Sequence, residues 1–268
     1  MRHRLSVAVV VFSTASSSAF AGVVITSSNM NFASKETSPI GAYIEADRLK
    51  IVTPQSTVIF RGDLMRTWVI GTAGGTYVEI TPEIVSAFAA RIAAAQTPGS
   101  PEQIRLQERL AKLPPQQRAA AEQQLRGLSG GPAAQQASYG KTGMTKAVSS
   151  WRCEVYGKIV DGQKQEELCI TPISALGLTD ADFRVLDLFS AFMGPIATSP
   201  IAPRADYLNW AVMNKAIGFS GIPLEATLLD GGRPALQDTM QKVEQTNIPA
   251  AEFDLPSGLT KRELTGSR

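Results

Sequence analysis

The sequence predicts an α+β domain whose main element is an antiparallel β-sheet. Short runs rich in β-branched and aromatic residues alternate with turn signals in the first part of the chain, and a second group of such runs fills the last part. Because most of these runs follow one another through short turns, their strands should pair antiparallel. Stretches with helical periodicity separate and interrupt the two groups, which adds helices to the sheet.

The N-terminal residues have the pattern of a signal peptide. The basic segment Arg2-His3-Arg4 precedes an apolar run over residues 5–12, and Ala19-Phe20-Ala21 matches the A-x-A site of signal peptidases. We expect cleavage after Ala21, which removes residues 1–21 and leaves residues 22–268 as a single domain in the periplasm. Gly22 offers no thiol for lipidation. The apolar run is shorter than the ~20 residues of a membrane span, so we expect no transmembrane segment.

Six runs in the first part of the mature chain are predicted strands. They are residues 23–26, 42–45, 49–52, 57–60, 64–70 and 76–80. Arg61-Gly62-Asp63 has the sequence of an adhesion tripeptide, but its position between two apolar runs is typical of a tight turn. Thr81 then caps a predicted helix with Pro82 at its first position. The helix has an apolar stripe, which predicts packing against an apolar surface, formed by Ile84, Val85, Phe88 and Ile92.

Residues 93–138 are rich in Ala, Gln, Pro and Gly, and we expect them to form a helical insertion. Two helical pieces, residues 101–113 and 114–128, precede the flexible segment Ser129-Gly130-Gly131-Pro132. A thin apolar edge along them is formed by Ile104, Leu110, Leu113, Leu125 and Leu128. Two interpretations remain open: a solvated helical hairpin, or an edge that covers a groove or binds an envelope protein.

The second part of the chain returns to strands around one apolar helix. A strand over residues 146–150 leads into a hairpin over residues 151–171, with its turn at Asp161-Gly162. Thr179 caps a helix with Asp180 and Asp182 in its first turn, where the helix dipole favours negative charge. Apolar residues cover more than one face of this helix, so the sheet should enclose it. The closing antiparallel strands are predicted over residues 224–229, 235–243 and 251–255.

Cys153 and Cys169 lie on the two strands of the predicted hairpin. Their positions place them opposite each other if the turn carries one bulged residue. In an oxidising compartment such a pair forms a disulfide, so we predict a structural one. The alternative, a reactive thiol or a metal-binding pair, has neither the C-x-x-C spacing nor a nearby histidine.

The composition argues against several classes of function. His3 is the only histidine in the sequence, so the mature chain lacks the usual general base and the commonest metal ligand. An enzyme would have to work with carboxylates, lysine or tyrosine alone, and no acidic pair has a persuasive spacing; we expect no enzyme, no cofactor and no metal. Without Arg2 and Arg4, the basic residues equal the 24 acidic ones in number, which argues against a nucleic-acid partner.

Five segments spread over most of the mature chain carry a resemblance to a known family. They are residues 112–118 (KLPPQQR), 151–156 (WRCEVY), the strand of Cys169, residues 175–183 and residues 248–258. In their order and spacing the chain resembles a family of uncharacterised exported bacterial proteins, which is itself similar to the LolA/LolB-like half-barrel lipoprotein carriers. The resemblance implies a strongly curved antiparallel sheet, an incomplete barrel, wrapped around helices. It carries over no site residues, and the helical insertion departs from the plain LolA plan.

A strongly curved sheet has a concave apolar face that either holds an apolar ligand or is filled by its own side chains. The candidate residues for lining such a cavity are Trp68, Phe183, Phe192 and Trp210. Apolar residues at these spacings are also typical of an ordinary core, so both interpretations stay open.

Three hypotheses about function follow. The first is a periplasmic non-enzymatic protein that binds a lipid or an acylated partner, such as a lipoprotein, in the implied half-barrel. The second is an envelope scaffold with a filled core that contacts a protein partner through residues 93–138. An enzyme is the third.

Overall fold

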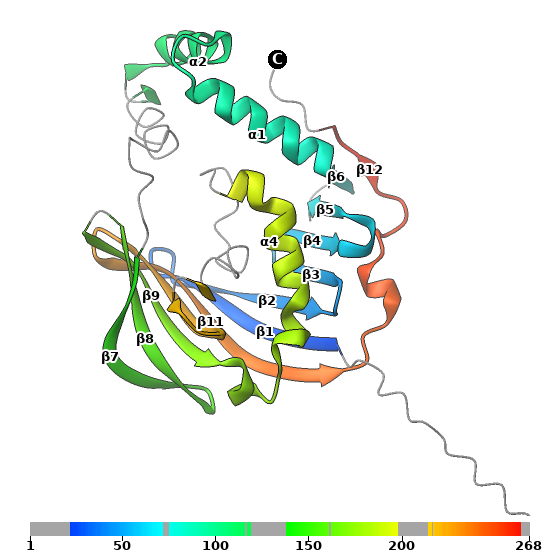
Figure 1. Cartoon of the computed structure of the whole chain (residues 1–268), viewed down its shortest axis with the longest axis vertical. Coiled ribbons are helices and arrows are strands. Elements are labelled where there is room, and N and C mark those ends of the chain that lie inside the picture. Colours follow the sequence, from blue (N-terminus) through cyan, green and yellow to red (C-terminus); the bar gives the residue numbers. More distant parts are fainter. Residues whose placement is uncertain are drawn as a thin grey trace, which may run out of the picture.

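The computed structural model describes residues 22–71, 75–115, 117–118, 138–160, 162–197, 214–215 and 217–263. Its main element is one sheet of twelve strands in the order β12-β6-β5-β4-β3-β2-β1-β11-β10-β9-β8-β7, and all neighbours pair antiparallel except β12 with β6 (Figure 1). The strands are β1 (Gly22–Asn31), β2 (Glu36–Ile44), β3 (Arg48–Val52), β4 (Ser56–Arg61), β5 (Arg66–Gly71), β6 (Thr76–Ile80), β7 (Ser138–Val148), β8 (Trp151–Val160), β9 (Gln163–Pro172), β10 (Gly221–Asp230), β11 (Arg233–Thr246) and β12 (Thr260–Lys261). The predicted α+β class with an antiparallel sheet is confirmed.

The described residues form three α-helices, namely α1 (Pro82–Gln96), α2 (Pro101–Ala111) and α4 (Arg184–Ala197). Helix α4 crosses one face of the sheet, and α1 continues from β6 above it (Figure 1). The short 3-10 helix Asp180–Phe183 leads into α4 through the predicted cap: Thr179 and Asp182 form a capping box that satisfies exposed backbone N–H groups. None of the helices in the described residues is long and apolar enough to cross a membrane.

The sheet is open and is neither closed nor strongly curled, which corrects the strong curvature implied by the half-barrel resemblance. A barrel closes only when its two edge strands pair with each other. Here the edge of β6 is occupied by β12, while β7 forms the opposite end of the sheet. The C-terminal residues therefore cover one edge of the sheet instead of completing a ring.

The predicted closing strand over residues 251–255 is wrong. Those residues form a 3-10 helix, Ala250–Phe253, and the chain adds its last strand only at Thr260–Lys261, parallel to β6. The predicted strand failed because Phe253 is buried against a face of the sheet and not paired along an edge. We call residues 248–261 the C-terminal strap.

Apolar residues on the two faces of the sheet form two separate cores. Successive residues on a strand point to opposite faces. Accordingly Phe60 belongs to the core beneath α4, whereas its neighbour Ile59 packs with Trp68 and Phe253 beneath the strap. We call these the helix-side core and the strap-side core.

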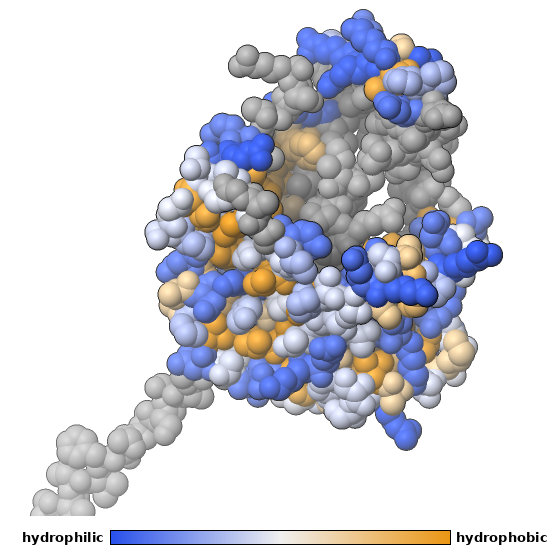
Figure 2. Space-filling model, turned by 180° about the vertical axis from the view of Figure 1, so that it is seen from behind, coloured by the Kyte–Doolittle hydropathy of each residue, from blue (hydrophilic) through white to orange (hydrophobic). Residues whose placement is uncertain are grey.

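The predicted insertion is described only in part. Helix α2 begins as expected after Ser100, whose Oγ accepts a hydrogen bond from the Gln103 N–H. Its Ile104 side chain is 49% exposed. In Figure 2 the α2 segment, at the upper right, is mostly hydrophilic with a small apolar spot. The second expected helical piece, residues 114–128, lies almost wholly outside the described residues.

Candidate ligand-binding site

A small apolar pocket lies between α4 and the sheet. We call it the α4 pocket; its volume is about 40 Å³, and its walls include Ile25, Ala42, Leu49, Phe183, Leu186 and Met240. Beside it, the Phe60 ring packs against Phe189 and Phe192, with ring centroids 5.0 and 5.4 Å apart. A pocket large enough for a drug-sized ligand has roughly 300–1,000 Å³. The α4 pocket is therefore much smaller than a site for such a ligand.

The four residues expected to line a cavity occupy different places. Phe183 lines the α4 pocket, and Phe192 packs nearby in the same helix-side core. Trp68 lies on the opposite face, in the strap-side core, where its indole N–H donates to Glu79 at 3.3 Å. Trp210 lies outside the described residues. The described structure thus brings two of the four together.

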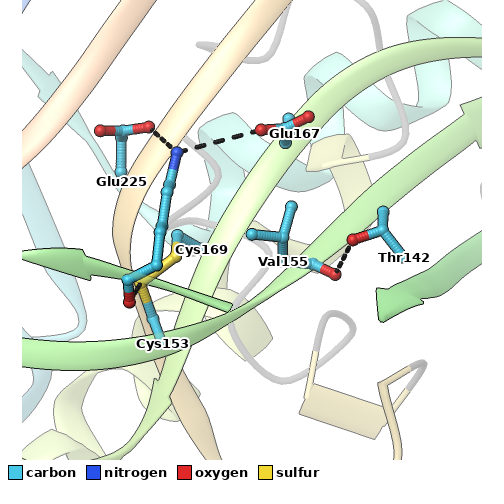
Figure 3. Close-up of a disulfide and its surroundings, with 7 residues drawn as sticks. Thr142, Cys153, Val155, Glu167, Cys169 and Glu225 are labelled. Carbon is cyan, nitrogen blue, oxygen red and sulfur yellow. Dashed lines mark hydrogen bonds and ion pairs between the residues drawn. A yellow bond between two sulfur atoms is a disulfide. The ribbon is translucent and has the colours of Figure 1, made fainter. Parts of the chain in front are cut away.

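The predicted disulfide is present between Cys153 on β8 and Cys169 on β9, and both residues are buried (Figure 3). The expected pairing of the two cysteines was wrong, because Val155, and not Cys153, lies opposite Cys169. The register shifts between Lys158 and Ile159, which places the cysteines diagonally across the two strands. They still share a face, since Cys153 and Val155 are two residues apart on one strand.

Charged residues surround this disulfide. Lys146 on β7 forms ion pairs with Glu225 and Glu167, which lie on the neighbouring strands β10 and β9 (Figure 3). Lys164 also pairs with Glu167. Both carboxylates have cationic partners, so the cluster links β7 to the strands beyond β8.

A larger pocket opens on the β7–β9 part of the sheet. We call it the hairpin pocket; its volume is about 510 Å³, and its walls are formed by Lys141, Thr145, Arg152, Cys153, Glu154, Ile170, Pro172 and Phe219. Ile170 is only 1% exposed and lies opposite Glu154 in the strand register, so it forms an apolar floor. The Phe219 ring packs against the Tyr156 ring with centroids 5.8 Å apart. The pocket therefore combines apolar walls with charged groups.

An irregular stretch of β7 shapes this pocket. The register of β7 against β8 shifts between Lys141 and Thr145, and Gly143 within this stretch has a φ of +79°, which favours glycine. The Thr142 hydroxyl donates to the Val155 carbonyl at 2.9 Å and holds the bulge against β8. Lys141 and Thr145 flank the bulge and line the pocket.

The charged groups of the hairpin pocket form one compact network. The Lys141 ammonium donates to Glu154 at 2.7 Å and lies 5.7 Å from the centre of the Tyr156 ring. The Tyr156 hydroxyl donates to the same carboxylate at 3.2 Å. The hydrogen bond from Lys141 lowers the pKa of Glu154 and in turn raises the pKa of Lys141, while burial raises the pKa of Tyr156. Glu154 thus stays ionised and Tyr156 stays neutral near pH 7.

Sequence reasoning missed the hairpin pocket. Arg152 and Glu154 alternate with Cys153 on β8, which is typical of an ordinary strand with a solvated face. Phe219 comes from beyond α4 in the chain, and no local pattern connects it with β8. Gly143 gave no usable signal, because an isolated glycine suggests a bulge only within a strand, and the predicted strand began at residue 146.

In the part of the chain that the structure describes, no group of three or more His, Cys, Asp or Glu residues is placed to hold a metal ion.

Comparisons with known proteins assign this chain to no family. No protein-family model and no curated protein matches it. Among solved structures, an uncharacterized conserved protein from Thermus thermophilus is similar with a TM-score of 0.44 at 9% identity, over 91% of each chain. PNGF-II is similar with a TM-score of 0.37 at 11% identity, over 90% of this chain and 30% of PNGF-II. This chain therefore spans less than a third of the length of PNGF-II. With no family assigned, the likeness to LolA/LolB-like proteins stays a prediction.

Proposed function

We propose that this chain is an exported, non-enzymatic protein of the bacterial envelope that binds an apolar or acylated ligand on its open antiparallel sheet. The observation that carries the proposal is the hairpin pocket, whose volume of about 510 Å³ lies within the roughly 300–1,000 Å³ typical of ligand sites. Its floor, Ile170, and its wall, Phe219, are apolar. Cleavage after Ala21 and a periplasmic location are parts of the same proposal.

The absence of an enzymatic role is also proposed. Residues 22–268 contain no histidine, which removes the side chain that most often transfers protons near pH 7. At the hairpin pocket, Glu154 is paired with Lys141, and the raised pKa of Tyr156 disfavours its use as a base. The residues of this pocket are thus better suited to binding than to proton transfer.

Native mass spectrometry of the mature protein from periplasmic extract tests this proposal. We expect an apolar adduct that solvent extraction releases, and we expect Thr145→Trp to abolish it, because an indole at this exposed rim position fills the pocket. Thr37→Trp is the matched control, since Thr37 is an exposed residue on the distant strand β2. A protein that stays free of adduct after incubation with envelope lipids, or an adduct that survives in Thr145→Trp, would contradict binding at this pocket.

A second candidate is an envelope scaffold, and the small size of the α4 pocket favours it. With a volume of about 40 Å³, this pocket is too small for an acyl chain. Helix α2 exposes Ile104 on the insertion and would supply the contact with a protein partner. Replacing residues 98–137 by a short glycine linker should then abolish crosslinking to an envelope protein while the circular dichroism of the sheet is kept. Crosslinking that survives the replacement would argue against this role for the insertion.

A further inference from the structure

We infer that the hairpin pocket selects an anionic amphiphile, with its apolar chain on the Ile170–Phe219 surface and its negatively charged end at Arg152. This inference rests on the proposed function and names the class of ligand. Arg152, Ile170 and Phe219 all line the same pocket, so one molecule can contact the guanidinium and the apolar walls together.

The other charges of the pocket compensate each other. Lys141 and Glu154 form an ion pair at 2.7 Å, and the Tyr156 hydroxyl donates a further hydrogen bond to Glu154. Arg152 is different, because no carboxylate among the described residues forms an ion pair with it. The pocket therefore carries one positive charge without an internal counterion. That charge sits beside an apolar floor, which is the arrangement that an anionic amphiphile complements.

Arg152 suits this role by its chemistry as well as its charge. A guanidinium is charged at every physiological pH and donates two parallel hydrogen bonds to a carboxylate or a phosphate. An exposed arginine alone attracts anions only weakly and is screened by salt. The apolar surface of Ile170 and Phe219 supplies the other part of the binding energy, because a chain laid on it leaves water. A cationic amphiphile would meet Arg152 with like charge, and a neutral one would leave it unused.

Binding of three ten-carbon probes to the mature protein tests the inference. Decanoate, decyl phosphate and decanol share one chain and differ in their polar end, and isothermal titration calorimetry measures their affinities. We expect Arg152→Gln to weaken decanoate and decyl phosphate about threefold to fivefold, since an exposed charge pair contributes only modestly to binding. Decanol should bind Arg152→Gln and the unmodified protein equally. Arg152→Lys should restore part of the affinity for anions, and Arg91→Gln, a change at an exposed arginine on α1, should have no effect.

A comparison of decanoate with decyl phosphate identifies the chemical class of the ligand's charged group. Tighter binding of decanoate supports a fatty acid or another acyl carboxylate as the ligand, and tighter binding of decyl phosphate supports a lipid phosphate. If Arg152→Gln binds decanoate as tightly as the unmodified protein does while Thr145→Trp weakens all three probes, the inference fails and the proposed function stands. If none of the probes binds the unmodified protein, the inference and apolar binding at this pocket fail together.

Discussion

The two cores of the molecule are stabilised in different ways. The helix-side core is large and packs the aromatic side chains of α4 against Phe60. The strap-side core has few buried residues and is covered by a segment with a single turn of 3-10 helix. Ion pairs hold that segment in place: Lys50 with Glu252 at 2.6 Å and Arg61 with Asp254 at 3.1 Å.

This difference between the two cores shows that each face of an open sheet needs its own element to shield its apolar residues from water. A helix covers a face with a continuous apolar stripe, whereas an extended strap covers it with isolated anchors such as Ile248 and Phe253. Partly exposed ion pairs contribute only about 0–1 kcal/mol each, so the strap depends mainly on its apolar anchors. We therefore expect that detaching the strap costs less free energy than unfolding the rest of the protein.

Phe60→Ala should have the largest effect. The Phe60 side chain is fully buried and contacts both Phe189 and Phe192, so its removal leaves a cavity beneath α4. Truncation of such a residue typically costs about 3–5 kcal/mol. Urea unfolding followed by circular dichroism measures this cost. A loss well under that range would mean that the helix-side core is loosely packed and able to bind a ligand beneath α4.

Removal of the disulfide should have the next largest effect. The bond joins two buried cysteines 16 residues apart, and the loss of a native disulfide costs about 2–5 kcal/mol. Urea unfolding of the Cys153→Ala/Cys169→Ala double variant measures the cost, and Cys153→Ser/Cys169→Ser is the polar counterpart. A double variant as stable as the parent would show that strand pairing alone fixes this hairpin.

The strands and the disulfide could be predicted because their signals are local. Alternating apolar residues and turn residues located β3, β4, β6 and β8 to within about two residues at either end, and the spacing of Cys153 and Cys169 around one turn was sufficient to predict their bond. The exact pairing was not predictable, because the register shift at Lys158 has no sequence signal.

The strap and the hairpin pocket could not be predicted for a different reason. Each depends on contacts between residues far apart in the chain: Phe253 with Ile59 and Trp68, and Phe219 with Tyr156. An apolar run such as residues 251–255 can pair along an edge or pack on a face, and its own sequence does not distinguish the two. The grouping of Trp68 with Phe183 was misleading for the same reason, since strand parity decides the face that each residue occupies.

Phe253→Ala sharpens the comparison between the cores, because Phe253 is as fully buried as Phe60. We expect a cost of about 2 kcal/mol in global unfolding, below the ~3–5 kcal/mol typical of such truncations, because a strap with few contacts can shift to close the cavity. Hydrogen exchange should rise selectively in β12 and in its neighbour β6. Uniformly increased exchange across the sheet would contradict independent detachment of the strap.

The end of the strap should also respond to acid. Glu79 accepts a hydrogen bond from the Lys261 ammonium, which lowers the pKa of Glu79, and the nearby Arg66 guanidinium lowers it further. A carboxyl group whose pKa is depressed in the folded state stabilises that state above its unfolded pKa of about 4.3, and this stabilisation is lost as the pH falls through the folded value. The protection factors of the Thr260 and Arg262 amides, which correct for the intrinsic pH dependence of exchange, should therefore fall below about pH 4 while those in the helix-side core are unchanged. The Glu79→Gln variant should show low protection at these amides already at pH 7 and no further pH dependence from this pair. Unchanged protection at pH 3 in the parent protein would mean that the backbone hydrogen bonds from Thr260 and Arg262 to β6 hold the strap without the ion pair.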